Sequence, residues 1–289
     1  MDWLLDGLFE SIRQGLIEAI LVHFVGMFDN INQQVGDIAV NVGMTPGEWN
    51  PGVFAMIRNL SETAVIPIAG MILTFVLCYE LIQLIIEKNN MHEFDVFNIY
   101  KWIFKTFCAV FILTNTFDLV IAVFALAQQV VNVSADVISG SLDLSADDTL
   151  AVLEAMLQDM GVWELIALWL QSFIVSLCLT VMTIVIFVII FGRMIEIYLT
   201  VSVAPIPLST MVNREWGQIG NNYLKSLFAL AFQAFLIMVC VAIYAALVQN
   251  IPTANNIHAA IWTTVGYTVL LCFALFKTSS LAKSLFSAH

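Results

Sequence analysis

The stretch that decides the fold is WELIALWLQSFIVSLCLTVMTIVIFVIIF, which runs from Trp163 to Phe191. A helix needs about 20 mainly apolar residues to cross a bilayer. This stretch is longer than that and has one charged side chain, Glu164, near its start. It is therefore predicted to be a transmembrane helix. Four further segments meet the same criterion: Ala64–Ile86, Ile103–Val131, Leu227–Val248 and Ala259–Phe276.

The composition of the whole chain agrees with these spans. The 289 residues are 61% hydrophobic and 11% charged, and the mean hydropathy is +0.93. Soluble domains carry about 25% charged residues, so a soluble enzyme is excluded, and the apolar content excludes a disordered chain. The net charge of −12 excludes a basic surface built to bind nucleic acid. The predicted fold class is an all-α, polytopic membrane protein.

The first 63 residues are predicted to form an exterior domain, and residues 64–289 a transmembrane helical domain. Between Trp3 and Phe28, apolar residues recur at helical spacing opposite an acidic face, which predicts an amphipathic helix. Its apolar stripe consists of Leu5, Leu8, Phe9, Ile12, Leu16, Ile20 and Phe24. The acidic face suits a protein partner better than anionic lipid. Asn41–Gly52 is rich in turn residues and is predicted to be a loop.

The positions of Lys and Arg predict how the chain is oriented. A sixth apolar stretch, Ile195–Met211, is interrupted by prolines and is expected to cross, to re-enter or to lie in the membrane plane. If it does not cross, eight of the ten basic residues share one side, and only Arg13 and Arg58 lie on the other. Five spans then place the N-terminus outside a bacterial cell membrane and the C-terminus in the cytoplasm. The acidic linker 132–161, which has no Lys or Arg, is predicted to lie outside.

No catalytic motif is present. The sequence has no phosphate-binding glycine loop, no H-E-x-x-H, no G-x-S-x-G and no dinucleotide fingerprint. The histidines are scattered, and each cysteine lies singly in an apolar run, as expected of a small buried apolar residue. The sequence therefore predicts no enzyme activity, no cofactor and no metal site.

Polar residues inside the predicted spans are functional candidates, because an ionisable side chain there costs about 2.5–3.5 kcal/mol. Asp118 lies near the middle of the second span and is interpreted either as an ion-coupling or pore-lining carboxylate or as part of a break. The break is favoured: Thr114–Asp118 divides the span, and Asn115 or Thr116 caps the second half. Glu80 is expected to reach the cytoplasmic interface, with Lys88 two turns later.

The stretch FGRMIEIYLTVSVAPIPL, from Phe191 to Leu208, is the richest in candidates. Its two prolines each remove a backbone donor and free carbonyls one turn earlier. In lipid those carbonyls need protein, Ser/Thr side chains or water as partners, so the stretch is expected to face protein or a lumen. An ordinary proline kink is the alternative. Arg193 and Glu196 are three apart and can pair. The candidates here and just beyond are Arg193, Glu196, Tyr198, Ser202, Ala204, Pro205, Pro207 and Trp216.

The pattern R-x-x-E-x-Y-L-x-x-S-x-A-P-I-P, from Arg193 to Pro207, followed by a W-G turn and two more spans, resembles the TrbL family. These are polytopic inner-membrane subunits of conjugative type IV secretion systems, here of the type carried by mobile elements of Gram-positive bacteria. The resemblance covers Trp163 to the C-terminus, and the whole chain in hydropathy. It implies an oligomeric scaffold or channel subunit that works with conjugation ATPases and other channel subunits. The resemblance also implies passage of a relaxase-linked single DNA strand, with transient DNA contact as an option.

Two other classes of function remain open from the sequence. An ion-coupled secondary transporter of a small solute would use Asp118 and the proline-broken stretch as a midplane site, although no internal repeat of spans is visible. A pore-forming, holin-like lytic protein is the weaker alternative. The conjugative secretion subunit is the favoured hypothesis.

Overall fold

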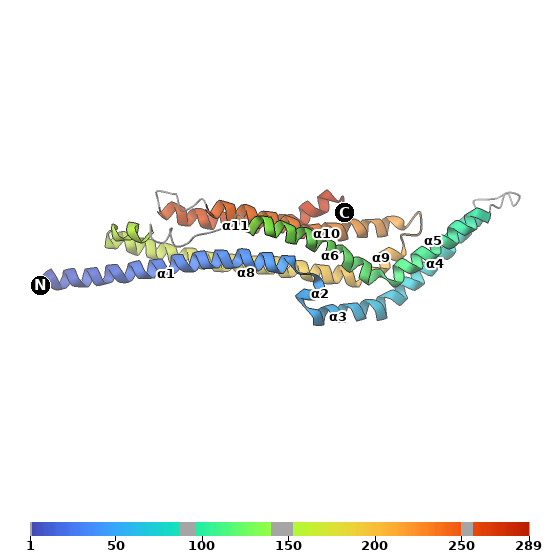
Figure 1. Cartoon of the computed structure of the whole chain (residues 1–289), viewed down its shortest axis with the longest axis horizontal. Helices are drawn as coiled ribbons and strands as arrows, with labels where there is room; N and C mark the ends of the chain where they lie inside the picture. Colours follow the sequence, from blue (N-terminus) through green and yellow to red (C-terminus); the bar gives the residue numbers. More distant parts are fainter. Residues whose placement is uncertain (1, 87–95, 140–152, 250–256, 289) are drawn as a thin grey trace. The chain divides into compact units, whose positions relative to one another are not determined.

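A computed structural model describes residues 2–86, 96–139, 153–249 and 257–288 (Figure 1). Within these ranges the chain contains helices and turns and no strand, which confirms the all-α prediction. The first helices are α1 (Asp2–Gly43), α2 (Pro46–Trp49), α3 (Pro51–Leu60) and α4 (Ile66–Ile86), with a π-helical turn, η1 (Ser61–Val65), between the last two. The helices that follow are α5 (Val96–Thr114), α6 (Thr116–Ser139), α8 (Val162–Ser202), α9 (Pro205–Ser209), α10 (Gly217–Gln249) and α11 (Ile257–Leu285). Residues 153–158 are also helical.

Several helices are long and apolar enough to cross a bilayer. Seven such stretches lie in the described residues: Glu10–Gly43, Pro51–Ile86, Phe97–Thr114, Thr116–Ser134, Val162–Ser209, Gly217–Gln249 and Ile257–Leu285. The chain is therefore a multi-pass membrane protein. Contacts between Cα atoms divide it into two compact units, one made of 1–42, 133–190 and 237–277, the other of 43–132, 191–236 and 278–289. This grouping differs from the predicted domains 1–63 and 64–289.

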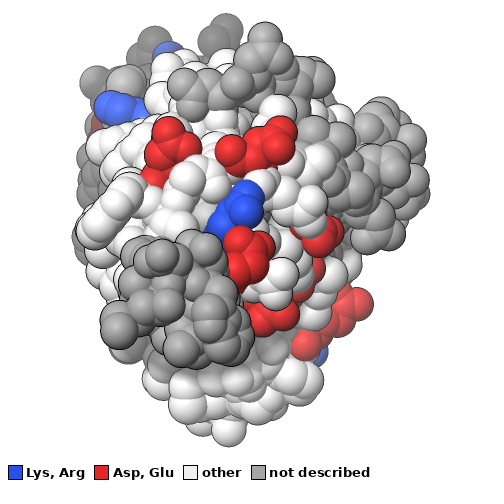
Figure 2. Space-filling model, turned by 90° about the vertical axis from the view of Figure 1, so that its left-hand side faces the viewer, with Lys and Arg blue, Asp and Glu red and all other residues white. Residues whose placement is uncertain are grey.

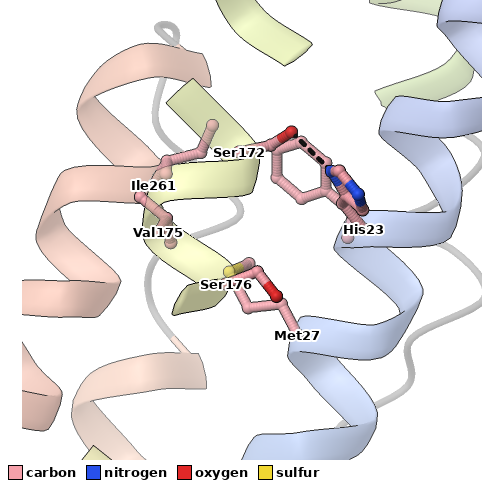
Figure 3. A pocket seen from close by; sticks show the side chains of 7 residues that line it. His23, Met27, Ser172, Val175, Ser176 and Ile261 are labelled. Atoms are coloured by element: carbon pink, nitrogen blue, oxygen red, sulfur yellow. Dashed lines mark hydrogen bonds between the residues drawn. The ribbon is translucent and has the colours of Figure 1, made fainter. Parts of the chain in front are cut away.

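The first unit contains a parallel pair of helices, α1 and α8 (Figure 1). The Nδ1 atom of His23 lies 3.0 Å from the Ser172 hydroxyl (Figure 3), and the Gln34 amide donates to the Thr183 hydroxyl over 2.5 Å. Partners in both contacts are 149 residues apart, so the two helices keep one register. On α1 the buried residues recur three or four apart, as in a coiled-coil seam: Ile20, Phe24, Met27, Ile31, Gln34, Ile38 and Val42.

The buried seam of α1 includes part of the apolar stripe that the sequence predicts. Ile20 and Phe24 of the predicted apolar stripe are buried, whereas Ile12 is exposed. The side chains of Leu5, Leu8 and Phe9 lie outside the described part of the chain. Beside His23, a pocket of about 10 Å³ between α1, α8 and Ile261 of α11 has room for about one water molecule (Figure 3).

The second unit is built around the C-terminal part of α8. Its main apolar core joins that segment to α3, α6 and α10 through Ile57, Phe117, Val120, Phe124, Met194, Ile197, Tyr198, Val201, Ala204, Leu208, Leu227, Leu230 and Ala231. A smaller core joins α4 to α5 through Ala69, Leu73, Leu77, Ala109 and Leu113. Ile206 of α9 packs on this smaller core, so the short proline helix links the two cores of the unit.

Three predicted boundaries differ from the structure. The predicted span Trp163–Phe191 does not end there, and Ile195–Met211 is not a separate segment. Instead α8 continues to Ser202, because no helix breaker occurs before Pro205. The predicted loop Asn41–Gly52 instead contains the end of α1, all of α2 and the start of α3.

The predicted span Ile103–Val131 is divided at Asn115, between α5 and α6. The break lies inside the predicted interval Thr114–Asp118. Side chains compete for carbonyls here: the Asn115 amide donates to the Phe111 carbonyl at 2.9 Å, and the Thr114 hydroxyl to the Val110 carbonyl at 3.0 Å. Such local bonds offer the backbone an alternative to the regular helix.

Candidate functional site

The candidate site is the segment from Phe191 to Gly217 in the second unit, which we call the proline junction. Here α8 ends, α9 forms a single turn, and α10 begins. Proline at positions 205 and 207 removes the bonds to the carbonyls of Val201 and Val203. These carbonyls are not left free, because they accept from the backbone N–H groups of Ala204 (3.3 Å) and Ile206 (3.1 Å). Tight turns therefore replace the lost helical bonds.

This geometry corrects the expected partners of the freed carbonyls. The Thr200 hydroxyl donates to the Glu196 carbonyl at 2.7 Å and the Ser202 hydroxyl to the Leu199 carbonyl at 2.8 Å. Both are bonds within α8 and serve carbonyls other than those that the prolines free. Ser202, Ala204 and Pro205 are buried among protein atoms, whereas Leu199 and Val203 are exposed. One face of the segment therefore packs on other parts of this chain.

Tyr198 ties α8 to the turn before α3. Its hydroxyl donates to the Pro46 carbonyl at 2.6 Å and lies 3.4 Å from the Asn50 carbonyl. The Trp49 ring packs at 5.8 Å on Tyr198 and at 5.2 Å on Phe191. A buried tyrosine needs a partner for its hydroxyl, and here that partner comes from a segment about 150 residues earlier. Tyr198 is thus a positioning residue for the proline junction.

We expect Tyr198→Phe to destabilise the second unit by about 1–2 kcal/mol, because the buried Pro46 carbonyl loses its donor while the ring packing is kept. Thermal unfolding of the purified protein in detergent would measure the change. Tyr100→Phe is a matched control, because Tyr100 is exposed on α5. Equal effects of the two substitutions would contradict a special role for the Tyr198 hydroxyl.

A capping box holds the turn that Tyr198 contacts. The Glu48 carboxylate accepts from the Thr45 N–H at 2.9 Å, and the Glu48 N–H donates to the Thr45 hydroxyl at 3.3 Å. The Gln128 amide of α6 donates to the same carboxylate at 3.1 Å. The Thr45 backbone hydrogen bond, assisted by the two side chains, lowers the pKa of Glu48 below its ordinary value.

Arg193 and Glu196 lie one turn apart on α8 but differ in exposure. Arg193 is 6% exposed, and its Nε and Nη1 atoms have no hydrogen-bond partner among the described residues. Glu196 is half-exposed and pairs at 3.3 Å with the Nζ atom of Lys283, on the last turn of α11. Glu196 therefore forms its close ion pair with Lys283, and it also interacts electrostatically with Arg193, the partner that the sequence suggested.

Two aromatic rings clamp the far end of the proline junction. The Trp216 ring stacks on Phe75 at 5.7 Å and on Tyr79 at 5.4 Å, both with interplanar angles of 10°. Next to it, the Glu215 carboxylate accepts from the Tyr79 hydroxyl at 3.3 Å and from the Gln83 amide at 3.1 Å. The turn before α10 is thereby fixed to one face of α4.

The start of α10 approaches α9 closely. A Cβ atom on Gly220 would lie 2.7 Å from the Pro207 carbonyl oxygen and 2.0 Å from the Met211 Cγ atom. The buried Asn213 side chain accepts from the N–H groups of Glu215 (2.7 Å) and Trp216 (3.1 Å). Sequence reasoning missed Gly220 and Asn213, although a glycine and an asparagine after two prolines are turn signals.

The two acidic intramembrane candidates, Asp118 and Glu80, are found in ion pairs. Asp118 lies 3.1 Å from the guanidinium of Arg58, which also binds Glu62 at 2.8 Å. Asn115 is at the helix break described above. Glu80 pairs with Lys105 of α5, a partner that the sequence did not suggest. Lys88, the neighbour expected for Glu80, lies outside the described residues.

Comparison with known proteins identifies the family. The family model described as TrbL/VirB6 plasmid conjugal transfer like protein matches residues 31–205, which is more than half of the chain. The resemblance read from the sequence begins at Trp163, so the two overlap over residues 163–205. The family match begins earlier, at residue 31, and ends at Pro205 in the proline junction. No curated protein and no solved structure matches the chain. The chain belongs to the TrbL/VirB6 plasmid conjugal transfer-like family and is thus a component of conjugal transfer by type IV secretion.

Proposed function

We propose that the protein is a membrane-embedded scaffold or channel subunit of a conjugative type IV secretion apparatus, and that it helps to translocate relaxase-linked single-stranded DNA. One observation carries the proposal: the family match extends over α2–α6 and all of α8. The match includes Tyr198 with its acceptors Pro46 and Asn50, and the contact of Gln34 on α1 with Thr183 on α8. The match therefore covers the Tyr198 anchor and the first part of the proline junction, up to Pro205.

The role is proposed to be structural, without catalytic chemistry of its own. The buried residues of the proline junction form tight turns, a tyrosine anchor and an aromatic clamp, all of which fix helices relative to one another within the second unit. Energy for transfer is then supplied by conjugation ATPases that bind other surfaces of the apparatus. The other proposed partners are further channel subunits and additional copies of this chain.

We propose an inner or plasma membrane location with the N-terminus outside and the C-terminus in the cytoplasm. The distribution of charge supports this orientation. If the segment 195–211 does not cross, eight of the ten basic residues share one side, and only Arg13 and Arg58 lie on the other. Basic residues are retained on the cytoplasmic side of membrane proteins, so the side with eight is assigned to the cytoplasm.

An in-frame deletion tests the proposed function. A donor strain that lacks this reading frame should lose DNA transfer in a mating assay and regain it when the intact chain is supplied in trans. The conjugation ATPase should also co-purify with the tagged chain from donor membranes. Transfer at the normal frequency without the chain would contradict the proposal.

The prolines provide a finer prediction. Pro205→Ala combined with Pro207→Ala should leave membrane insertion intact but reduce transfer or complex assembly at least tenfold, because α8 would continue as a regular helix past Ser202 and displace α9 from the small core. Mating frequency and the size of the solubilised complex would measure this. Normal transfer by the double variant would mean that the segment is an ordinary kink.

A further inference from the structure

Helix α1 of the first unit has a second row of residues opposite its buried seam. These residues are also spaced three and four apart, and every one of them is exposed: Glu18, Val22, Val25, Asp29, Asn32, Gly36 and Val40. We call this row the outer stripe. One face of α1 is thus occupied by α8, whereas the other has the spacing of a helix-packing seam and is covered by nothing in the described part of the chain.

The outer stripe fits neither lipid nor water well. Glu18 and Asp29 lie on the same side of the helix, three turns and about 16 Å apart. A carboxylate facing hydrocarbon costs about 2.5–3.5 kcal/mol, which argues against a lipid-facing stripe. Val22 and Val40, however, are 68% and 57% exposed. Apolar residues between acidic ones are the surface that an apolar helix with basic side chains would complement.

The groove at the N-terminal end of the outer stripe has the same character. It measures about 410 Å³ and is lined by the apolar side chains of Ile17 and Leu21 and the carboxylates of Glu10, Glu18 and Glu154. Arg13, its basic residue, is already engaged, because it pairs with Glu10 at 3.5 Å and donates to the Gln158 carbonyl. Figure 2 shows acidic side chains grouped around a basic side chain, with uncharged surface beside them.

We propose that the outer stripe of α1 docks a helix of another protein subunit that presents two Lys or Arg residues three turns apart, with small apolar residues between them. The cations meet Glu18 and Asp29, and the apolar residues cover the valines. Close approach is open at Gly36, where a Cβ atom would meet no atom of this chain. A second copy of α1 does not fit, because its carboxylates would face these carboxylates. The inference rests on the proposed function in one respect: the partner helix is taken to come from another subunit of the proposed apparatus.

A binding assay on the full chain, purified and reconstituted in lipid nanodiscs, tests this inference without using DNA transfer. The probe is a synthetic helical peptide with an alanine–valine face and two lysines spaced as Glu18 and Asp29 are. A second peptide has glutamate at both positions. The lysine peptide should bind saturably and more weakly at high salt, and the glutamate peptide should not bind.

Two pairs of substitutions separate the outer stripe from overall charge. Glu18→Gln with Asp29→Asn should weaken binding of the lysine peptide about tenfold. Asp37→Asn with Asp159→Asn removes the same charge from exposed positions off the stripe and should leave binding within about twofold. Gly36→Leu, whose Cβ atom has no atom of the described residues within 4 Å, should also weaken binding.

Three results would overturn the inference: no saturable binding of the lysine peptide, equal binding of the two peptides, or equal losses in the two paired variants. Without saturable binding, the outer stripe would be a surface that faces water and has no partner. Equal losses in the two paired variants would mean that binding depends only on the net charge of the chain. If the peptide does not bind but the deletion strain loses DNA transfer, the inference fails and the proposed function stands. If the peptide binds as expected but the deletion strain transfers DNA normally, the inference stands and the proposed function fails.

Discussion

Replacing Gly220 with alanine is expected to destabilise the second unit by about 1–3 kcal/mol, the usual cost of overpacking a filled site. The added Cβ atom would lie 2.7 Å from the Pro207 carbonyl oxygen, a backbone atom that cannot rotate away, as well as 2.0 Å from the Met211 side chain. The better helix propensity of alanine, about 1 kcal/mol, offsets only part of this cost. Helix α9 must shift for the substitution to be accommodated.

Gly192→Ala is the matched control for that experiment. Gly192 lies in the same unit, inside α8, and a Cβ atom there meets nothing within 4 Å. Alanine at 192 should therefore be neutral or stabilising by about 1 kcal/mol. Thermal unfolding in detergent and mating frequency would be measured for both variants. If Gly220→Ala is as stable as Gly192→Ala, the close contact of α9 with α10 does not hold the junction together.

Trp216→Ala should have an effect of similar or greater size. The substitution removes a large ring that stacks on both Phe75 and Tyr79 of α4. Loss of a well-packed tryptophan costs about 3–5 kcal/mol when it is buried, and the partial exposure of Trp216 places the expected loss near about 3 kcal/mol. The turn at 213–216 would then keep the hydrogen bonds of Glu215 to Tyr79 and Gln83 of α4.

Trp216→Phe keeps a ring in the same place and should recover most of the lost stability, because offset and stacked aromatic pairs each contribute about 0.5–1.5 kcal/mol. The readouts are the unfolding temperature and the rate of limited proteolysis at the turn before α10. Equal behaviour of the alanine and phenylalanine variants would show that the clamp is dispensable. Glu215→Gln is a second control, which measures how much the carboxylate next to Trp216 contributes to the stability of the turn.

The sequence was sufficient for the class of fold and for part of its detail. Long apolar runs with few charges have one stable form in a bilayer, so the helical membrane class follows from composition. The break near Asn115 could be predicted because Thr and Asn compete for local carbonyls. The continuation of α8 past Phe191 could not be read from hydropathy, because Arg193 and Glu196 resemble the charged end of a span although the backbone there is helical.

Contacts between distant segments were beyond sequence reasoning. Tyr198 finds its acceptor at Pro46, and Glu196 finds Lys283, because the folded core brings these segments together. Local spacing on one helix suggested Arg193 as the partner of Glu196, since residues three apart share a face. Tertiary packing then buried Arg193 and left Glu196 half-exposed. Only Ile20 and Phe24, the first two residues of the α1 seam, belonged to the predicted apolar stripe, and the partner helix α8 was not predicted.

The central claim is that this is a multi-pass membrane subunit with its basic flank in the cytoplasm. Cysteine labelling of whole donor cells with a membrane-impermeant maleimide tests it most directly, in a variant whose native cysteines are replaced: Cys78, Cys108, Cys178, Cys240 and Cys272. A cysteine placed at Asp147 should be labelled in intact cells, whereas one placed at Ser284, beside Lys283, should be labelled only after permeabilisation. Labelling of both positions from the same side would contradict the account.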